Sequence, residues 1–281
     1  MAVESGWVLS GAVLLGLAVG SFLNVVIHRL PLMLERQWQR EAAHQAGHAP
    51  LPQERPLNLA FPRSACPQCG HTLAPWENLP VLGWLLLRGR CSACGARIGL
   101  RYPLVEIATG ALFGYAAWRW GLTPAGGAWA AFSATLLTLA VIDWNTTLLP
   151  DNLTLPLAWG GLVAAALGWS GVPLADALWG AVAGYLSLWA VYQVFKRLTG
   201  KEGMGYGDFK LYAALGAWLG WQALIPVILL ASITGAGVGI IMKLTGNLRE
   251  GGYVPFGPFL ALGGFAAMAG GTQRFWLALG L

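Results

Sequence analysis

The sequence contains several long apolar stretches, and their length limits what the chain can fold into. A helix needs about 20 apolar residues to cross the hydrocarbon core of a bilayer. Inside that core a helix also satisfies all of its own backbone polar groups. Hydrophobic residues make up 56% of the chain and charged residues only 10%. The sequence therefore predicts an all-α membrane protein that crosses the bilayer several times.

About eight transmembrane helices are expected. They cover roughly residues 7–28, 103–120, 126–146, 152–169, 173–195, 209–220, 222–242 and 255–279. The run 209–220 reaches only about 18 Å as a helix. It is consistent with a half-span, a re-entrant segment or one helix continuing past Gly220. The polar stretch between the first two runs is long enough for a small domain. Three parts follow: a first helix at 1–28, a loop domain at 29–101 and a helical bundle at 102–281.

The distribution of positive charge predicts the orientation. Nine of the 17 basic residues lie within 29–101, and basic loops tend to stay in the cytoplasm. This loop domain is therefore expected in the cytoplasm and the N-terminus outside. The net charge of +5 fits this topology and contact with anionic membrane lipids, so nucleic acid is not expected as a partner. With alternating spans, Asp143 and Asp208 both fall on the cytoplasmic side, at the same depth.

Asp143 and Asp208 are the candidate catalytic residues. Asp208 follows the glycine-rich run 203–207, where backbone can approach closely. Two neighbouring carboxylates share one proton. One can then activate water while the other polarises a peptide carbonyl, as in aspartic proteases. The alternative is that each aspartate caps a helix or pairs with a lysine. Asp151, after Pro150, is expected to be such an N-cap.

The cysteines predict a metal site. The chain has four, in two C-x2-C pairs: Cys66 with Cys69, and Cys91 with Cys94. This pattern is typical of a four-thiolate zinc ribbon, here at about 60–100. A redox pair or two disulfides are the alternatives, although a cytoplasmic location argues against disulfides. A closed shell of four thiolates makes the zinc structural. His71 is a further candidate ligand, but a surface polar role is expected for it.

Glu106 is the third acidic residue of interest. It enters the second predicted span, where a carboxylate is costly unless it is paired. A partner such as Arg101 would explain its presence. A ligand-binding role is the alternative.

Taken together, these residues resemble the type IV prepilin peptidases, also called prepilin leader peptidase/N-methyltransferases. The resemblance runs over nearly the whole chain. Besides the paired cysteines, it rests on segments 20–31, 76–80, 87–91, 102–106, 143–151, 205–208 and 255–259. Of these, 143–151 carries a D-x6-P-D pattern and 205–208 reads Gly-Tyr-Gly-Asp.

The resemblance implies an intramembrane aspartic endopeptidase of the bacterial inner membrane, with Asp143 and Asp208 as its catalytic pair. Its substrates would be prepilins or pseudopilins of type IV pili or type II secretion, whose short basic leaders are cut on the cytoplasmic side after a glycine. The resemblance also implies N-methylation with S-adenosylmethionine. No fingerprint for that donor is visible, and Glu106 is the candidate for its pocket. Two rival functions are an ion- or proton-coupled transporter using the two aspartates and a non-catalytic assembly scaffold.

Overall fold

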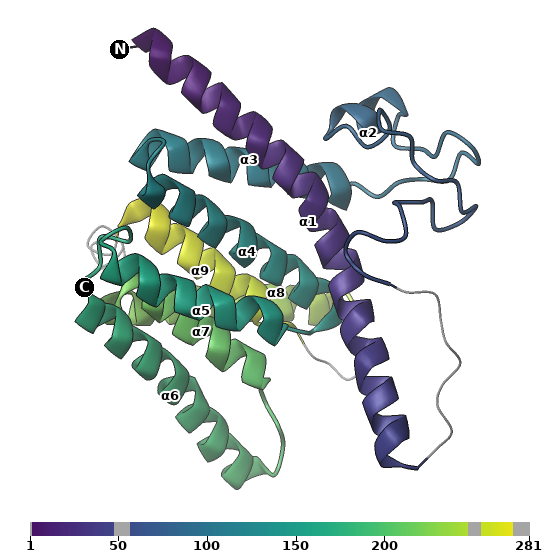
Figure 1. The fold of residues 1–281 in the computed structure, drawn as a ribbon. Coiled ribbons are helices and arrows are strands. Elements are labelled where there is room, and N and C mark those ends of the chain that lie inside the picture. Colours follow the sequence, from purple (N-terminus) through teal and green to yellow (C-terminus); the bar gives the residue numbers. More distant parts are fainter. Residues whose placement is uncertain (1, 48–56, 247–253, 272–281) are drawn as a thin grey trace. The chain divides into compact units, whose positions relative to one another are not determined.

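The computed structural model describes residues 2–47, 57–246 and 254–271. Over these ranges the chain is helical, with one short 3-10 helix, two isolated β-bridges and no strand (Figure 1). It divides into two compact units, Met1–Arg119 and Trp120–Leu281. The helical class expected from the apolar stretches is confirmed for the part of the chain that is described.

The described part of the first unit contains two long helices and one short one: α1 (Ala2–Gln45), α2 (Leu82–Leu86) and α3 (Arg101–Trp120). Close approach of α1 to α3 depends on glycine. A Cβ at Gly16 would lie 2.8 Å from the Cα of Gly110, and one at Gly20 would lie 2.7 Å from the Cα of Glu106. Small residues four apart are a common means of bringing membrane helices together. The sequence Gly-Leu-Ala-Val-Gly at 16–20 therefore fixes how closely the two helices pack.

The helix α1 extends well beyond the predicted span at 7–28. It continues through Pro31 and ends at Gln45. The residues after 31 are mostly Leu, Glu, Arg, Gln and Ala, which all have high helix propensity. Their polarity marks the end of an apolar stretch but not the end of a helix, so residues 29–45 of the predicted loop domain continue the helix that begins in the first span.

The second unit is a bundle built around α7. Its elements are α4 (Pro124–Thr146), α5 (Asp151–Ala166), α6 (Leu174–Thr199), α7 (Tyr206–Leu219), the 3-10 helix η1 (Trp221–Ala223), α8 (Leu224–Leu244) and α9 (Gly257–Gly270). Helix α7 packs against α5, α6 and α9, while α9 also packs against α4 and α8. Most residues of α7 are buried, and the buried ones all lie between Asp208 and Leu219.

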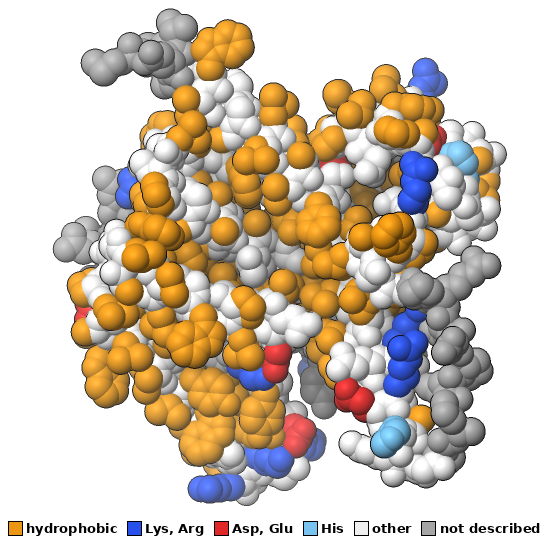
Figure 2. All heavy atoms as spheres, viewed as in Figure 1, with side chains coloured by type: hydrophobic (Ala, Val, Ile, Leu, Met, Phe, Trp, Pro, Cys, Tyr) orange, Lys and Arg blue, Asp and Glu red, His pale blue; other side chains and the backbone are white. Residues whose placement is uncertain are grey.

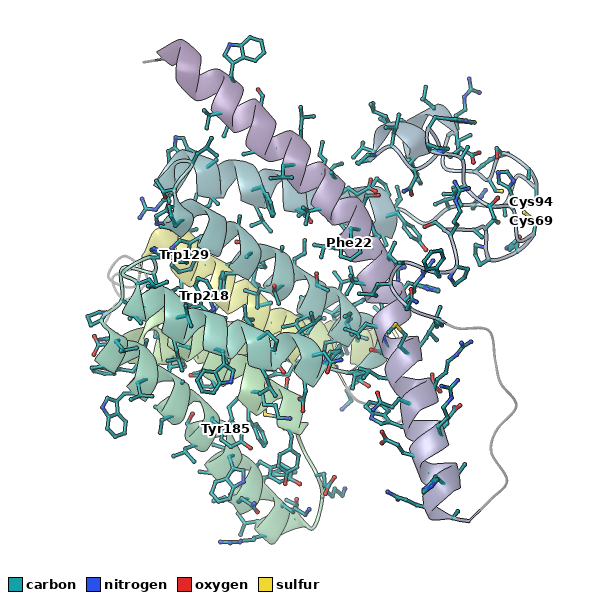
Figure 3. All side chains as sticks on the ribbon, in the orientation of Figure 1. Phe22, Cys69, Cys94, Trp129, Tyr185 and Trp218 are labelled. Atoms are coloured by element: carbon teal, nitrogen blue, oxygen red, sulfur yellow. The ribbon has the colours of Figure 1, made fainter. Side chains whose placement is uncertain are left out.

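Specific contacts hold α7 in the bundle. Gly180 of α6 and Gly216 of α7 meet backbone to backbone. The Trp218 indole N–H donates to the carbonyl of Leu157, 2.8 Å away. Its ring packs 5.3 Å from that of Trp129 on α4 (Figure 3). Helix α7 is therefore a fixed internal element rather than a surface helix.

The run predicted at 209–220 forms a helix of its own, α7. Helix α7 ends at Leu219, and Gly220 takes φ 80°, a conformation that ends the helix, before η1 and α8 begin. The alternative of one helix continuing past Gly220 was therefore wrong.

Each of the eight predicted runs coincides with a helix, although residues 272–279 of the last run lie outside the described residues. Among the described residues, four helical segments are long and apolar enough to cross a membrane: α1 from Gly6 onward, α4, α6, and η1 with α8. Figure 2 shows hydrophobic side chains gathered over α5 and α6. Those with large exposed surfaces include Trp159 and Trp179. Exposed apolar surface of this extent marks a membrane or protein contact.

Candidate active site and metal centre

Asp143 lies near the C-terminal end of α4, with its side chain buried. The helix ends just beyond it, where Thr147 adopts the left-handed conformation and donates its N–H to the carbonyl of Asp143. One carboxylate oxygen, Oδ2, accepts the backbone N–H of Gly257 over 2.9 Å. Gly257 is the first residue of α9, so the carboxylate lies at a helix N-terminus, which favours negative charge.

Asp208 lies in the first turn of α7 and is also buried. Asp143 is among the groups that act electrostatically on it. Leu149 shows how the two segments meet. A Cβ on Gly207 would lie 2.7 Å from the Cβ of Leu149, and one on Gly257 would lie 3.2 Å from its Cδ2. The structure therefore brings the two predicted aspartates to one buried place in the second unit.

Asp151 has a different role from the one predicted. The N-cap position of α5 is occupied by Pro150, and Asp151 is the first residue of the helix. Its carboxylate oxygens lie 2.6 and 2.7 Å from Nζ of Lys210 on α7. The prediction of an N-cap was wrong because the side chain turns toward a neighbouring helix. Pairing with a lysine, the other ordinary role considered for aspartates, is the one that Asp151 has.

The loop before Asp208 is anchored by residues that the sequence analysis did not single out. Nζ of Lys196 lies 2.6 Å from Glu202, and the hydroxyl of Tyr192 donates to the same carboxylate over 3.2 Å. The hydrogen bond from Lys196 holds the pKa of Glu202 below its usual range. The Tyr192 ring packs 5.5 Å from Tyr206 and 5.6 Å from Phe209. These contacts fix the glycine-rich loop at both of its ends.

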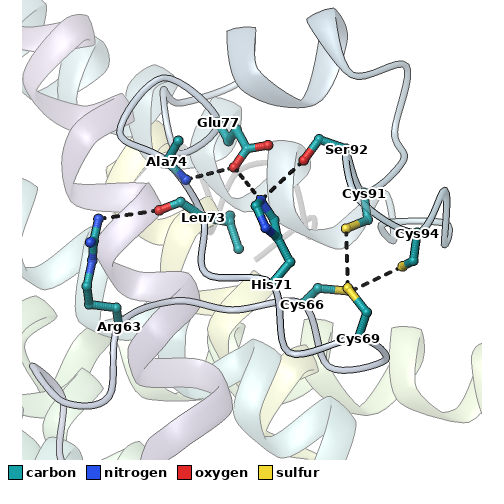
Figure 4. Close-up of polar contacts among 10 residues, drawn as sticks. All are labelled: Arg63, Cys66, Cys69, His71, Leu73, Ala74, Glu77, Cys91, Ser92 and Cys94. Atoms are coloured by element: carbon teal, nitrogen blue, oxygen red, sulfur yellow. Dashed lines mark hydrogen bonds and ion pairs between the residues drawn. The ribbon is translucent and has the colours of Figure 1, made fainter.

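The four cysteines gather into one cluster, as predicted from their spacing. Their sulfur atoms all lie within 4.8 Å of one another. The Sγ atoms are 3.8 Å apart for Cys66 and Cys94 and 3.9 Å apart for Cys69 and Cys91 (Figure 4). Sulfurs around a tetrahedral zinc, each about 2.3 Å from the metal, are about 3.8 Å apart. All four are free thiols, so the disulfide alternative has no support here. The cluster has the donors and the dimensions for a metal ion.

Each cysteine pair lies in a turn of the same form. The N–H of Gly70 donates to the carbonyl of Cys66, and the N–H of Gly95 donates to the carbonyl of Cys91, both over 2.9 Å. Both glycines have φ 71°, a conformation that glycine adopts readily. The glycine directly after each C-x2-C pair was the sequence signal for these matched turns.

The thiols in this cluster differ in their affinity for protons. Hydrogen bonds from the backbone N–H groups of Cys69 and Gln68 lower the pKa of Cys66 to about 6. The backbone N–H of His71 acts in the same direction on Cys69. The neighbouring sulfurs have the opposite effect on Cys69, and the sulfur of Cys94 has the largest one. Together they outweigh the His71 N–H and raise the pKa of Cys69 to about 12. Thiolates are the metal-binding form, and several thiolates this close together require a cation.

His71 belongs to a polar network next to the cysteines rather than to the cluster of sulfurs. Its Nε2 lies 3.1 Å from a carboxylate oxygen of Glu77 and 3.3 Å from the hydroxyl of Ser92 (Figure 4). Glu77 also accepts the N–H of Ala74 over 2.7 Å. Hydrogen bonds, that of Ser92 first, hold the pKa of Glu77 below its usual range. Because serine and glutamate meet the same ring nitrogen, this is not the arrangement of a catalytic triad.

Glu106 has hydrogen-bond partners that differ from both expectations, an ion pair with Arg101 and a bound ligand. Its Oε2 accepts the backbone N–H of Val81 over 2.7 Å, and Ser21 of α1 provides a second hydrogen bond. Val81 has φ 61° and lies directly before α2. Glu106 thus ties the segment after the first cysteine pair to α3, and its expected partner Arg101 is not needed to explain its burial.

Two family models match the chain. The bacterial peptidase A24 N-terminal domain covers residues 14–120 and the type IV leader peptidase family covers residues 130–240. A protein of Pseudomonas aeruginosa described as prepilin leader peptidase/N-methyltransferase is 54% identical over 93% of this chain and 90% of its own length. The chain belongs to the prepilin leader peptidase/N-methyltransferase family.

Relatives in other bacteria carry the same description. One from Burkholderia pseudomallei strain K96243 is 51% identical over 99% of this chain and 90% of its own length. One from Aeromonas hydrophila is 53% identical over 92% and 90% respectively. No solved structure matches the chain. Membership in this family makes the chain an enzyme with protease and methyltransferase activities, and the transporter alternative finds no support.

Proposed function

We propose that this chain removes the short basic leader of type IV prepilins and pseudopilins at the cytoplasmic face of the bacterial inner membrane, and then methylates the new N-terminus. The names of the relatives support this substrate class. The observation that carries the proposal is the pair of buried aspartates, one from α4 and one from α7. Both are next to glycines, Gly257 and Gly207, that have no side chain to fill the space around the carboxylates.

Asp143 and Asp208 are the proposed catalytic pair. A backbone N–H at a helix N-terminus stabilises a carboxylate more than a carboxylic acid. The Gly257 N–H on Asp143 therefore supports Asp143 as the base that takes a proton from water. Asp208 then holds the shared proton and donates it as the peptide carbonyl is attacked. Burial of both side chains excludes bulk water, which strengthens these electrostatic effects.

The proposed topology has eight spans, an outer N-terminus and a cytoplasmic loop domain within 29–101. Its support is the match of every predicted run with a helix and the exposed apolar side chains of α5 and α6. Helix α7 has 14 residues, about 21 Å, which is shorter than the hydrocarbon core. We assign it as a half-span enclosed by its neighbours. The aspartate at its first turn is then held close to the membrane surface.

The four cysteines are proposed to hold one structural zinc in a ribbon at about 60–100. The sulfur–sulfur distances support a tetrahedral four-thiolate shell. Because such a shell has no open position, the metal would stabilise its module and take no part in catalysis.

The methyl donor is proposed to be S-adenosylmethionine, which supplies a methyl group to the new amine when bound. A free α-amine has a pKa near 8, so part of it is already deprotonated at cytoplasmic pH and no strong base is required. We place the donor pocket in the first unit near Glu106, as a site distinct in function from the aspartate pair. The hydrogen bonds of Glu106 to Val81 and Ser21 give it a positioning role there.

The test uses purified protein, a prepilin and S-adenosylmethionine, with products followed by mass spectrometry. Wild type should release the leader and add one methyl group. Asp143→Asn and Asp208→Asn should abolish cleavage yet still methylate pilin supplied without its leader. Asp176→Asn is the matched control, because Asp176 contacts Trp221 and Gln222 instead.

Cleavage that survives in either catalytic variant would remove the aspartates from the mechanism. Loss of both activities in either variant, with the fold intact, would point to one shared site.

A further inference from the structure

The interface of α1 and α3 becomes polar toward the start of α3. Gly20, Asn24 and His28 follow one another at a spacing of four residues and so lie on one face of α1. Two contacts show that this face meets α3. A Cβ at Gly20 would lie 2.7 Å from the Cα of Glu106, and Nδ2 of Asn24 donates to the carbonyl of Tyr102 over 3.0 Å.

The side-chain oxygen of Asn24, Oδ1, accepts no hydrogen bond from the described residues. The side chain is buried, with 4% of the residue exposed. Its Nδ2 donates to the carbonyls of Gly20 and Tyr102, so the amide cannot be turned around without setting oxygen against oxygen. Within the described ranges, Oδ1 meets no hydrogen-bond donor. A buried polar atom in this state is normally met by a ligand or an ordered water.

Arg101 leaves a donor unused beside the same residues. Its Nε is buried and has no acceptor among the residues described. The guanidinium lies 5.0 Å from the centre of the Tyr102 ring, and its charge acts on His28. Arg29, the other cation that acts on His28, is already engaged with the carbonyls of Asn58 and Pro62. Of the two described cations that act on His28, Arg101 is thus the one with capacity for an anion.

The charges around Asn24 have a definite order. Arg101 supplies a positive group at the start of α3, and Glu106 supplies a carboxylate just over one turn further on. Asn24 reaches Tyr102, which lies between them in the sequence. A zwitterion with a carboxylate and an ammonium group matches this order, because its carboxylate can meet Arg101 and its ammonium can donate to Oδ1 of Asn24.

We propose that Asn24 and Arg101 bind the amino-acid end of the methyl donor, with Glu106 supplying negative potential for the ammonium. This inference rests on the proposed methylation and makes its donor pocket specific. S-adenosylmethionine carries an α-carboxylate and an α-ammonium group on its methionine part. The unused acceptor of Asn24 and the unused donor of Arg101 are the two partners that this part requires.

The test measures binding rather than turnover. The full-length protein, purified in detergent, is titrated calorimetrically with S-adenosylhomocysteine, which keeps the amino-acid end but has no methyl group to transfer. A second titration uses methylthioadenosine, which lacks that end. Asn24→Leu and Arg101→Gln should each weaken binding of S-adenosylhomocysteine by about tenfold to hundredfold, as expected for a hydrogen bond to a charged group. Binding of methylthioadenosine should stay unchanged.

Arg40→Gln is the matched control, because Arg40 lies exposed on α1 in the same unit and its loss should change neither affinity. Thermal unfolding of each variant reports on the fold. If Asn24→Leu does not fold, Arg101→Gln at its half-buried position decides.

Wild-type affinity for S-adenosylhomocysteine in both folded variants would overturn the inference, and the polar pair would then hold only water. Equal loss of both ligands would overturn it as well, because the effect would not be confined to the amino-acid end. Failure of the wild type to methylate any pilin would instead refute the proposed function.

Discussion

Gly257→Ala is the substitution that tests the active site most directly. The backbone N–H of Gly257 holds Oδ2 of Asp143 at 2.9 Å. A methyl group at this position would lie 2.7 Å from the same oxygen. The φ of Gly257 is not in the left-handed region, so alanine is compatible with the backbone. The perturbation therefore acts almost entirely on the position of one carboxylate.

The size of the effect follows from the distance. Ordinary contact begins at 3.4 Å, so the carboxylate and the new methyl group must separate by about 0.7 Å. Leu149 limits the retreat of α9, since it lies 3.2 Å from the same methyl position. Misplacing a catalytic group by about 1 Å can cost about a hundredfold in rate. Gly257→Ala is therefore expected to slow leader cleavage by about tenfold to hundredfold.

The assay is the initial rate of prepilin cleavage, with methylation of pilin without its leader measured alongside. Gly270→Ala is the control, because Gly270 lies in the same helix and its Cβ would meet nothing within 4 Å. Cleavage should be normal in Gly270→Ala, and methylation should be normal in both variants. A wild-type cleavage rate in Gly257→Ala would show that Asp143 is not held by this contact in the working enzyme.

Three further predictions concern other parts of the molecule. Gly207→Ala should impair cleavage and Gly205→Ala should not, because the new methyl group would lie 2.7 Å from Leu149 in the first case and 3.8 Å from its nearest neighbour in the second; equal rates would contradict this. Cys66→Ser should lower the zinc content measured by elemental analysis and make residues 60–100 sensitive to protease, since structural zinc contributes on the order of 10 kcal/mol to the folding free energy of its module. A strong chelator should have the same two effects on the wild-type protein. Asp151→Asn should retain most cleavage activity and lose at most about 1 kcal/mol of stability, measured by thermal unfolding, because the substitution breaks only the ion pair between Lys210 and an exposed carboxylate. An inactive variant would assign Asp151 a catalytic role.

The sequence predicted the helices well because the physical cause is local. An apolar run of sufficient length forms a helix in a membrane whatever its neighbours are. Two C-x2-C pairs likewise predict a cluster of sulfurs, since the spacing itself forms the turns. Hydropathy predicted the first span but not where α1 ends, because hydropathy reports on the membrane. A polar sequence such as that of residues 32–45 can still be helical.

Contacts between distant segments were beyond sequence reasoning. Gly257 and Asp143 are 114 residues apart, and nothing in either local sequence reports the bond between them. The pairing of Asp151 with Lys210 was missed for the same reason. By contrast, the glycines at 16 and 20 form a recognisable helix-packing pattern, so the close approach of α1 to α3 could have been predicted.

The hydrogen bonds from Arg29 to backbone carbonyls have a practical consequence for engineering. The chain leaves this residue along α1 as far as Gln45, and it returns where Arg29 binds the carbonyls of Asn58 and Pro62. The segment between Arg29 and Asn58 therefore starts and ends at the same anchored side chain, so its length can change without altering the structure on either side of it. Doubling the length of such a closed segment costs only about 0.6 kcal/mol. A purification tag or fluorescent reporter inserted after Gln45 should therefore leave the packing of α1 against α3 intact.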